Sequence, residues 1–108
     1  MSAADILTGA ATLIEARGKC VREYRDDDGR LCTVGAMREV AFGNALTAPT
    51  HHGVDVAARE HYLTAHRAMH LHIGDRSVTN WSDEHPAEVV VAALRTAAAG
   101  LAPAGGRS

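Results

Sequence analysis

The residues in this chain best suited to chemistry are its histidines, seven among 108 residues. His66 and His70 are four residues apart, so a helix would place both imidazoles on one face, as two zinc ligands require. Arg67 stands where the helix of a zinc protease carries a glutamate that activates water. The candidates for a third ligand are His51, His52, Asp83 and His85. The spacing keeps a metal-binding protein or a small metal-dependent enzyme as an alternative to a solvated helix face.

A second pair of histidines, His61 and His72, falls on the apolar stripe predicted for the same helix. Eleven residues separate them, which is roughly 16 Å along a helix axis, so one metal ion cannot bind both within a chain. We interpret them as histidines of the core or of an interface. If they line a self-association surface, protonation near pH 6 would weaken it. Identical dimerisation at pH 5.5 and pH 8 would contradict that hypothesis.

The segment Asn80-Trp81-Ser82-Asp83 allows two interpretations. Trp81 is the only tryptophan, and a large ring before a small-residue helix predicts a core side chain over the first apolar residues of that helix. Asp83 could then accept hydrogen bonds from the N–H groups that begin the last helix, making the segment a structural latch. Alternatively, Asn80, Trp81 and Asp83 form a polar and aromatic contact patch, because aromatic anchors are frequent binding hot spots.

Other chemistries find less support in the sequence. The acidic run 26–28 before Gly29 lacks the twelve-residue loop and final glutamate of a calcium site. Cys20 and Cys32 have no catalytic motif around them and are predicted to be buried free thiols. The net charge is −2 and the basic residues are dispersed, so a nucleic-acid-binding regulator is kept only as a further alternative. An enzyme is therefore less expected than a binding protein, and no cofactor is implied.

The elements that must position these residues are mainly helical. Apolar periodicity predicts helices over 3–16, 32–46, 54–73 and 86–100. Thr33 is the predicted N-cap of the second helix, and Gly35 near its start suggests the close approach of another backbone. The segment 20–32 predicts a short β-hairpin with a two-residue turn at Asp28-Gly29. "VTNWSD" after Ser77 predicts a short turn.

We therefore expect a mainly α (α-rich α+β) fold of about four helices and one hairpin. Residues 1–100 would form a single domain, and 101–108 a disordered tail. The first, third and last helices would supply the main core, whose alanine-rich faces bury little area. Self-association through the helix 54–73 would compensate for this, which makes a homodimer possible.

No signal peptide or membrane span is expected in this sequence. The first residues lack a basic start, and acidic residues interrupt their apolar run. No apolar run approaches the roughly 20 residues that a spanning helix needs. These features favour a cytoplasmic protein.

Two segments, "DGRLCTVGAMREVA" and "SVTNWSDEHPAEVVVAAL", carry a family resemblance. The chain is similar to a family of small uncharacterised actinobacterial and actinophage proteins that share a "G..CalGA" segment and a "WND…aEV" segment. Ser82 replaces the usual Asn, and the link to the last helix is shorter. The resemblance implies a small accessory protein, often phage-borne. The matching positions are Gly29, Cys32, Gly35 and Ala36, then Trp81, Ser82, Asp83, Ala87, Glu88 and Val89.

Together these observations predict a small non-enzymatic protein that acts by binding a host or self protein. The residues expected at its contacts are Asn80, Trp81, Asp83, His61 and His72.

Overall fold

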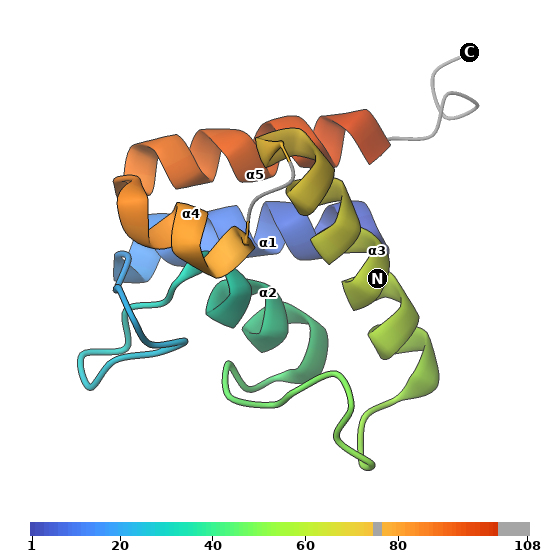
Figure 1. Cartoon of the computed structure of the whole chain (residues 1–108). Coiled ribbons are helices and arrows are strands. Elements are labelled where there is room, and N and C mark those ends of the chain that lie inside the picture. The colour runs from blue at the N-terminus through green and yellow to red at the C-terminus, as the bar shows by residue number, and fades with distance from the viewer. Residues whose placement is uncertain (75–76, 102–108) are drawn as a thin grey trace.

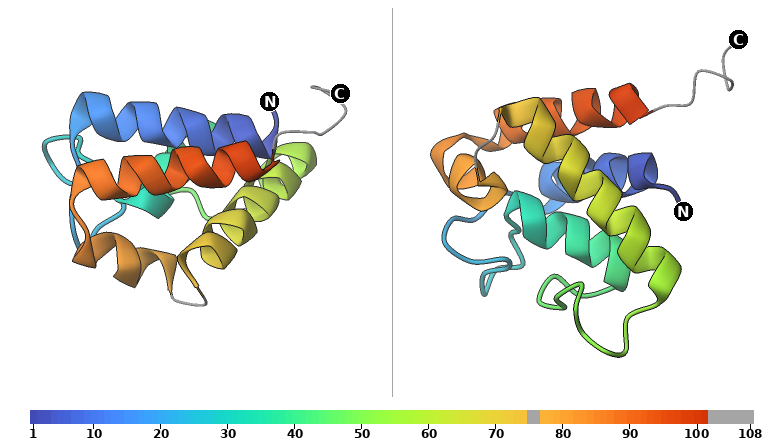
Figure 2. Two further views of the ribbon diagram at one scale, coloured as in Figure 1. Left: turned by 90° about the horizontal axis from the view of Figure 1, so that it is seen from above. Right: turned by 45° about the vertical axis from the view of Figure 1, so that its right-hand side comes forward.

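A computed structural model describes residues 1–74 and 77–101, which form five α-helices (Figure 1). α1 and α5 run antiparallel and side by side, with α2 against α1 and α3 lying across the bundle (Figure 2). The expected α-rich class is confirmed. None of the helices described has the length and apolar character needed to cross a membrane. The helices are α1 Ala3–Arg17, α2 Thr33–Phe42, α3 Val56–Ile73, α4 Val78–Glu84 and α5 Ala87–Leu101.

The predicted count of four helices is wrong because the segment expected to be a turn forms α4. The Ser77 side chain accepts a hydrogen bond from the Asn80 N–H at 3.4 Å and caps this helix. Val78, Trp81 and Ser82 are buried, so apolar burial on one face stabilises even this short helix. The boundary expected for the tail also shifts, because Leu101 ends α5, and residues 102–108 lie outside the described part of the chain.

The predicted hairpin at 20–32 is likewise wrong, because the described residues contain only isolated bridges there. Leu31 pairs with Lys19 in a parallel bridge and with Arg25 in an antiparallel one. The Asp26 carboxylate shapes the turn, accepting from the N–H groups of Asp28 and Arg30 and from Arg30 Nε at 2.6 Å. This side-chain acceptor closes a longer turn than the two-residue hairpin loop expected at Asp28-Gly29.

The start of α2 also differs from the prediction. Cys32, not Thr33, is the N-cap, and its Sγ accepts from the Gly35 N–H at 3.3 Å. Thr33 lies inside the first turn, where its hydroxyl is bonded to α4 instead. Both Cys20 and Cys32 are buried free thiols, as predicted.

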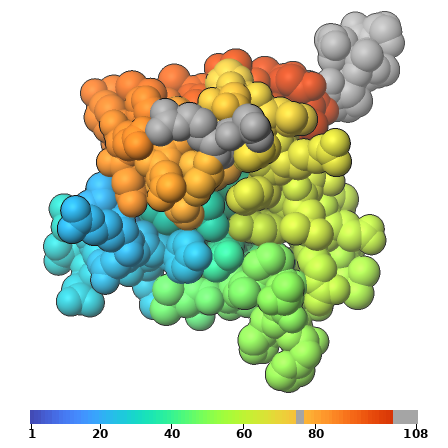
Figure 3. Space-filling view, in the orientation of Figure 1, coloured from blue at the N-terminus to red at the C-terminus, as the bar shows by residue number. Residues whose placement is uncertain are grey.

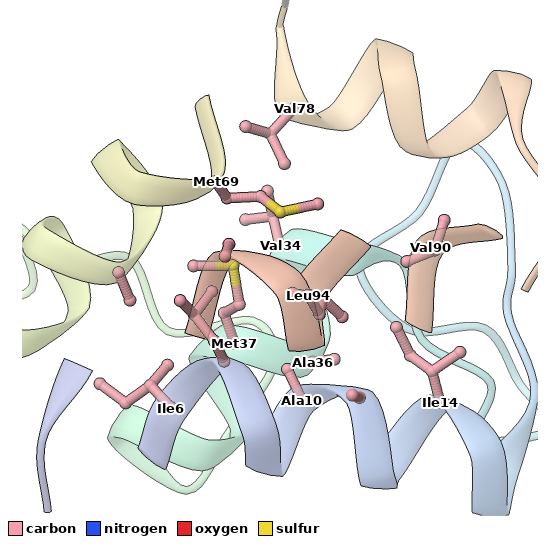
Figure 4. Close-up of a cluster of buried hydrophobic side chains, with 14 of the residues drawn as sticks. Ile6, Ala10, Ile14, Val34, Ala36, Met37, Met69, Val78, Val90 and Leu94 are labelled. Carbon is pink, nitrogen blue, oxygen red and sulfur yellow. The ribbon is translucent and has the colours of Figure 1, made fainter. Parts of the chain in front are cut away.

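The core lies around α1, which packs against α5, α2 and α3, and α4 adds Val78 at one side (Figure 4). α2 contributes more than expected, since Met37 is fully buried and Val34 nearly so. Ala10 of α1 is also fully buried and lets the neighbouring helices approach closely. The fully buried large apolar side chains are Ile6, Leu7, Ile14, Leu31, Met37, Met69, Val90 and Leu94.

The close backbone approach suggested at Gly35 is present. The carbonyl oxygen of Tyr24 lies 1.9 Å from the position that a Cβ at residue 35 would occupy. The same carbonyl accepts a hydrogen bond from the Cys32 N–H at 3.2 Å. The loop before Leu31 therefore rests directly on the first turn of α2, and only glycine fits beneath it.

We predict that Gly35→Ala lowers the free energy of unfolding by about 3 kcal/mol, because the new methyl group must displace backbone rather than a flexible side chain. Denaturant unfolding followed by circular dichroism measures the change. Gly100→Ala is the matched control: a Cβ there meets no neighbour within 4 Å, so this variant should be neutral or slightly stabilising. Equal stability of both variants would contradict the close approach.

Candidate functional site

An open pocket of about 330 Å³ lies between residues 22–24 and α4. We call it the loop–α4 pocket. Figure 3 shows the loop, in blue, directly below α4, in orange. Two of the predicted contact residues, Asn80 and Asp83, line it. The lining residues are Arg22, Glu23, Tyr24, Cys32, Thr79, Asn80 and Asp83.

Arg22 has an unusual backbone conformation in this pocket. Its φ of 67° lies in the left-handed region, and it is the single non-glycine residue with positive φ among those the structure describes. A left-handed conformation costs an L-residue roughly 1–2 kcal/mol. The Asp83 carboxylate accepts a hydrogen bond from the Arg22 N–H at 3.2 Å and helps to hold this conformation.

This contact corrects the role predicted for Asp83. The carboxylate was expected to accept from the first N–H groups of the last helix, but it bonds to the backbone of Arg22, sixty-one residues earlier in the chain. Asp83 closes α4 onto the loop, and so it helps to build the pocket. Arg22 was not predicted from the sequence, because no residue pattern indicates that an arginine will have a left-handed backbone conformation.

Trp81 lies on the inner side of α4 and is therefore not the exposed aromatic anchor that a contact patch would need. Its side chain is only 8% exposed, and its ring stacks on that of His85 with centroids 4.6 Å apart. The His85 Nδ1 lies 2.7 Å from the Trp81 carbonyl oxygen. This burial supports the structural interpretation of Trp81. Tyr24, which is 37% exposed, is the aromatic side chain that lines the pocket.

Ser82, also on α4, links the pocket to the core. Its hydroxyl oxygen accepts from the Thr33 N–H at 3.2 Å and from the Thr33 hydroxyl at 2.8 Å. Both side chains are fully buried. The Ser82 carbonyl in addition accepts from Lys19 Nζ at 2.7 Å. Polar contacts thereby fix α4 to α2 and to the segment that follows α1, and they determine the position of α4 more narrowly than apolar packing alone.

A second chain of contacts leads from the pocket to α3. The Arg38 guanidinium lies over the Tyr24 ring, 4.4 Å from its centroid. Arg38 Nε lies 3.4 Å from the Tyr62 hydroxyl and donates to it. Arg38 therefore holds the pocket's aromatic ring against the helix bundle.

The two thiols are unsuited to nucleophilic chemistry. Burial raises the pKa of Cys32 above its ordinary value, although Cys32 lines the pocket. Burial also raises the pKa of Cys20, whose thiol donates to the Glu23 carbonyl at 3.2 Å. Both thiols are therefore protonated at neutral pH, whereas a nucleophilic cysteine must be a thiolate.

The histidines of α3 are arranged differently from the prediction. His61 and His72 are exposed, so their interpretation as core residues is wrong, while their role at an interface stays a prediction. The buried residues of α3 are Tyr62, Ala65 and Met69. The buried face is thus rotated toward Tyr62, because a tyrosine ring buries more apolar area than a histidine or an alanine.

His66 and His70 are half-buried on this rotated side of the helix. The rings of His66 and Tyr62 lie 6.0 Å apart. Burial lowers the pKa of His66 below its ordinary value of 6.5, and the nearby positive charges of His70 and Arg38 lower it further. Within residues 1–74 and 77–101, no group of three His, Cys, Asp or Glu side chains is placed to hold a metal ion.

A protein-family model matches residues 1–100, and its description is "Family of unknown function (DUF6197)". The chain belongs to this family. A search of curated proteins and a search of solved structures each returned no match. The family match agrees with the resemblance to an uncharacterised family, and it extends over α1 to α5, so the loop–α4 pocket lies wholly within the part of the chain that the family shares.

For the DUF6197 domain, we predict a loss of stability in mild acid that depends on His66. Because the pKa of His66 is lower in the folded chain, the unfolded chain binds a proton on this histidine at a higher pH than the folded chain does. Below about pH 6.5 the free energy of unfolding therefore falls with falling pH. His66→Gln should flatten this slope in denaturant unfolding between pH 7.5 and pH 5. Exposed His61→Gln is the matched control for loss of a histidine. Equal slopes in all three proteins would contradict burial as the cause.

We predict that Ser82→Ala lowers the free energy of unfolding by about 1–3 kcal/mol, because Thr33 then keeps a buried N–H and hydroxyl without their acceptor. A double-mutant cycle with Thr33→Val, measured by denaturant unfolding, isolates the contact between the two hydroxyls. Additive effects of the two substitutions would show that the hydroxyls do not interact.

Proposed function

We propose that this protein is a small non-enzymatic accessory protein that binds another protein through the loop–α4 pocket. The observation that carries the proposal is the left-handed backbone of Arg22, a residue that lines the open pocket and is held by the Asp83 carboxylate. Strained backbone that the surrounding structure maintains is concentrated at functional sites. Glycine would adopt this conformation without strain. We therefore infer that the arginine side chain itself is needed at this position.

The pocket offers the groups that protein contacts use. Arg22 supplies a guanidinium, Asn80 an amide with donors and an acceptor, and Tyr24 a ring held in place by Arg38. Tyrosine and arginine are enriched among residues that dominate binding energy. Glu23 and Asp83 add two carboxylates to the lining, so a polar peptide segment that carries an amide or a basic side chain fits this combination.

The same lining disfavours catalysis. Its one thiol, on Cys32, is kept protonated by burial, and none of the residues that line the pocket is a histidine that could act as a general base. The partner we propose is a host or self protein of an actinobacterium or its phage, met in the cytoplasm. The resemblance of the two sequence segments supports this origin.

Affinity capture of the tagged protein from an actinobacterial lysate, with quantitative mass spectrometry, tests the proposal. We expect one stoichiometric partner for the wild type and its loss with Asn80→Ala and with Arg22→Gly. Arg22→Gly should at the same time raise the free energy of unfolding by about 1 kcal/mol, because glycine relieves the left-handed strain. Loss of binding in a stabilised variant separates contact from folding.

Arg95→Gln is the control, because Arg95 lies on α5 outside the pocket and forms only an exposed ion pair with Glu15. This variant should retain the partner. A partner captured equally by Arg22→Gly and by the wild type would contradict the role of the pocket, and so would the absence of any stoichiometric partner.

A further inference from the structure

The outer face of α3 carries large apolar side chains in solvent. Val56 is 62% exposed, Leu63 50% and Leu71 66%. The spacings of seven and eight residues place all three on one stripe of the helix, opposite the buried stripe of Tyr62, Ala65 and Met69. α3 lies across the front of the other helices in the right-hand view of Figure 2, so no other described helix lies over it there.

Two opposite charges lie between these apolar side chains on the same stripe. Glu60 falls between Val56 and Leu63, and Arg67 falls between Leu63 and Leu71. Both are exposed, and neither side chain forms a hydrogen bond or an ion pair with the residues that the structure describes. The stripe therefore presents unpaired charges of both signs at fixed positions among apolar side chains. We call the residues 56, 60, 63, 64, 67 and 71 the outer stripe.

The order of these side chains makes the outer stripe complementary to itself. When two copies of α3 lie antiparallel with a twofold axis between Leu63 and Thr64, Val56 of each copy faces Leu71 of the other. In the same register Glu60 of each copy faces Arg67 of the other, so both charge pairs are satisfied at once. A parallel pair in register would instead place Glu60 against Glu60 and Arg67 against Arg67, which repel.

We propose that the outer stripe binds a second copy of this chain, forming an antiparallel, twofold-symmetric helix pair. The interface is isologous, as a closed dimer requires. Apolar contacts of Val56, Leu63 and Leu71 supply the attraction, and the Glu60–Arg67 pairs fix direction and register. The outer stripe shares no residue with the loop–α4 pocket, so this inference does not depend on the proposed function.

The apolar groove at one end of the stripe suits this arrangement. It lies between α3 and α5 and has a volume of about 600 Å³. In the antiparallel register, Val56 of the second copy approaches Leu71 beside this groove. Leu71 and Arg67 of the outer stripe line it on the α3 side, and Ala97 and Leu101 line it on the α5 side.

Charge reversal tests both the surface and the register. Sedimentation velocity over a range of micromolar concentrations should show concentration-dependent dimerisation of the wild type. Glu60→Arg or Arg67→Glu alone should weaken dimerisation about tenfold or more, because each dimer then holds two like-charge contacts. The double variant Glu60→Arg/Arg67→Glu should recover dimerisation, because every pair is again of opposite sign.

Mixing the two single variants tests whether positions 60 and 67 of the two copies meet across the interface. The Glu60→Arg chain carries two positive charges on its outer stripe, and the Arg67→Glu chain carries two negative charges at the same two positions. An antiparallel pair of these chains joins opposite charges at both contacts, so the heterodimer should form when neither variant dimerises alone. Asp27→Arg, a reversal at an exposed residue of the loop, is the matched control and should leave dimerisation unchanged.

The outcomes that would overturn the proposal are distinct. A wild type that stays monomeric over the whole concentration range excludes the dimer. A dimer that tolerates both single reversals forms through another surface. A mixture of the two single variants that stays monomeric, or a double variant that does not recover, excludes the antiparallel register.

Discussion

The carbonyl oxygen of Tyr24 fills the space that any side chain at position 35 would need, so the loop can meet α2 only across a glycine. The Cys32 N–H donates a hydrogen bond to the same carbonyl, and this bond holds the loop against the start of α2. It places the loop beside α4, within reach of the Asp83 carboxylate, and sets the Tyr24 ring under Arg38. The pocket walls therefore depend on one backbone contact.

Much of the helical framework follows from local sequence, and its errors have physical causes. Periodicity located four of the five helices, because long amphipathic segments carry enough apolar residues to define a face. α4 escaped prediction since seven residues give almost two turns and too few repeats, although the Ser77 cap marks its start. The hairpin failed because the Asp26 side chain, rather than a paired strand, satisfies the turn's backbone donors.

Only part of the pocket lining could be predicted from the sequence. Asn80 and Asp83 were predicted as contact residues from their place beside the only tryptophan, and both line the pocket. Arg22 and Tyr24 were not, because they are distant from Asn80 and Asp83 in the sequence, and only the tertiary fold sets the left-handed backbone of Arg22. Gly35 was the one signal in the sequence that pointed toward this contact, since a helix rarely carries glycine in its first turn without a packing reason.

α3 carries large apolar side chains on both its inward and its outward side. Its inward side buries one large aromatic residue, one methionine and an alanine, while its outward side exposes a valine and two leucines. Alanine-rich faces on α1 and α5 allow close packing but leave little apolar area to stabilise a monomer of this length. Apolar area that the interior does not use is available between copies, where the charges of Glu60 and Arg67 allow only one direction of pairing. The alanine-rich interior packs closely but buries little apolar area. Association through the outer stripe of α3 would bury additional apolar area between two copies.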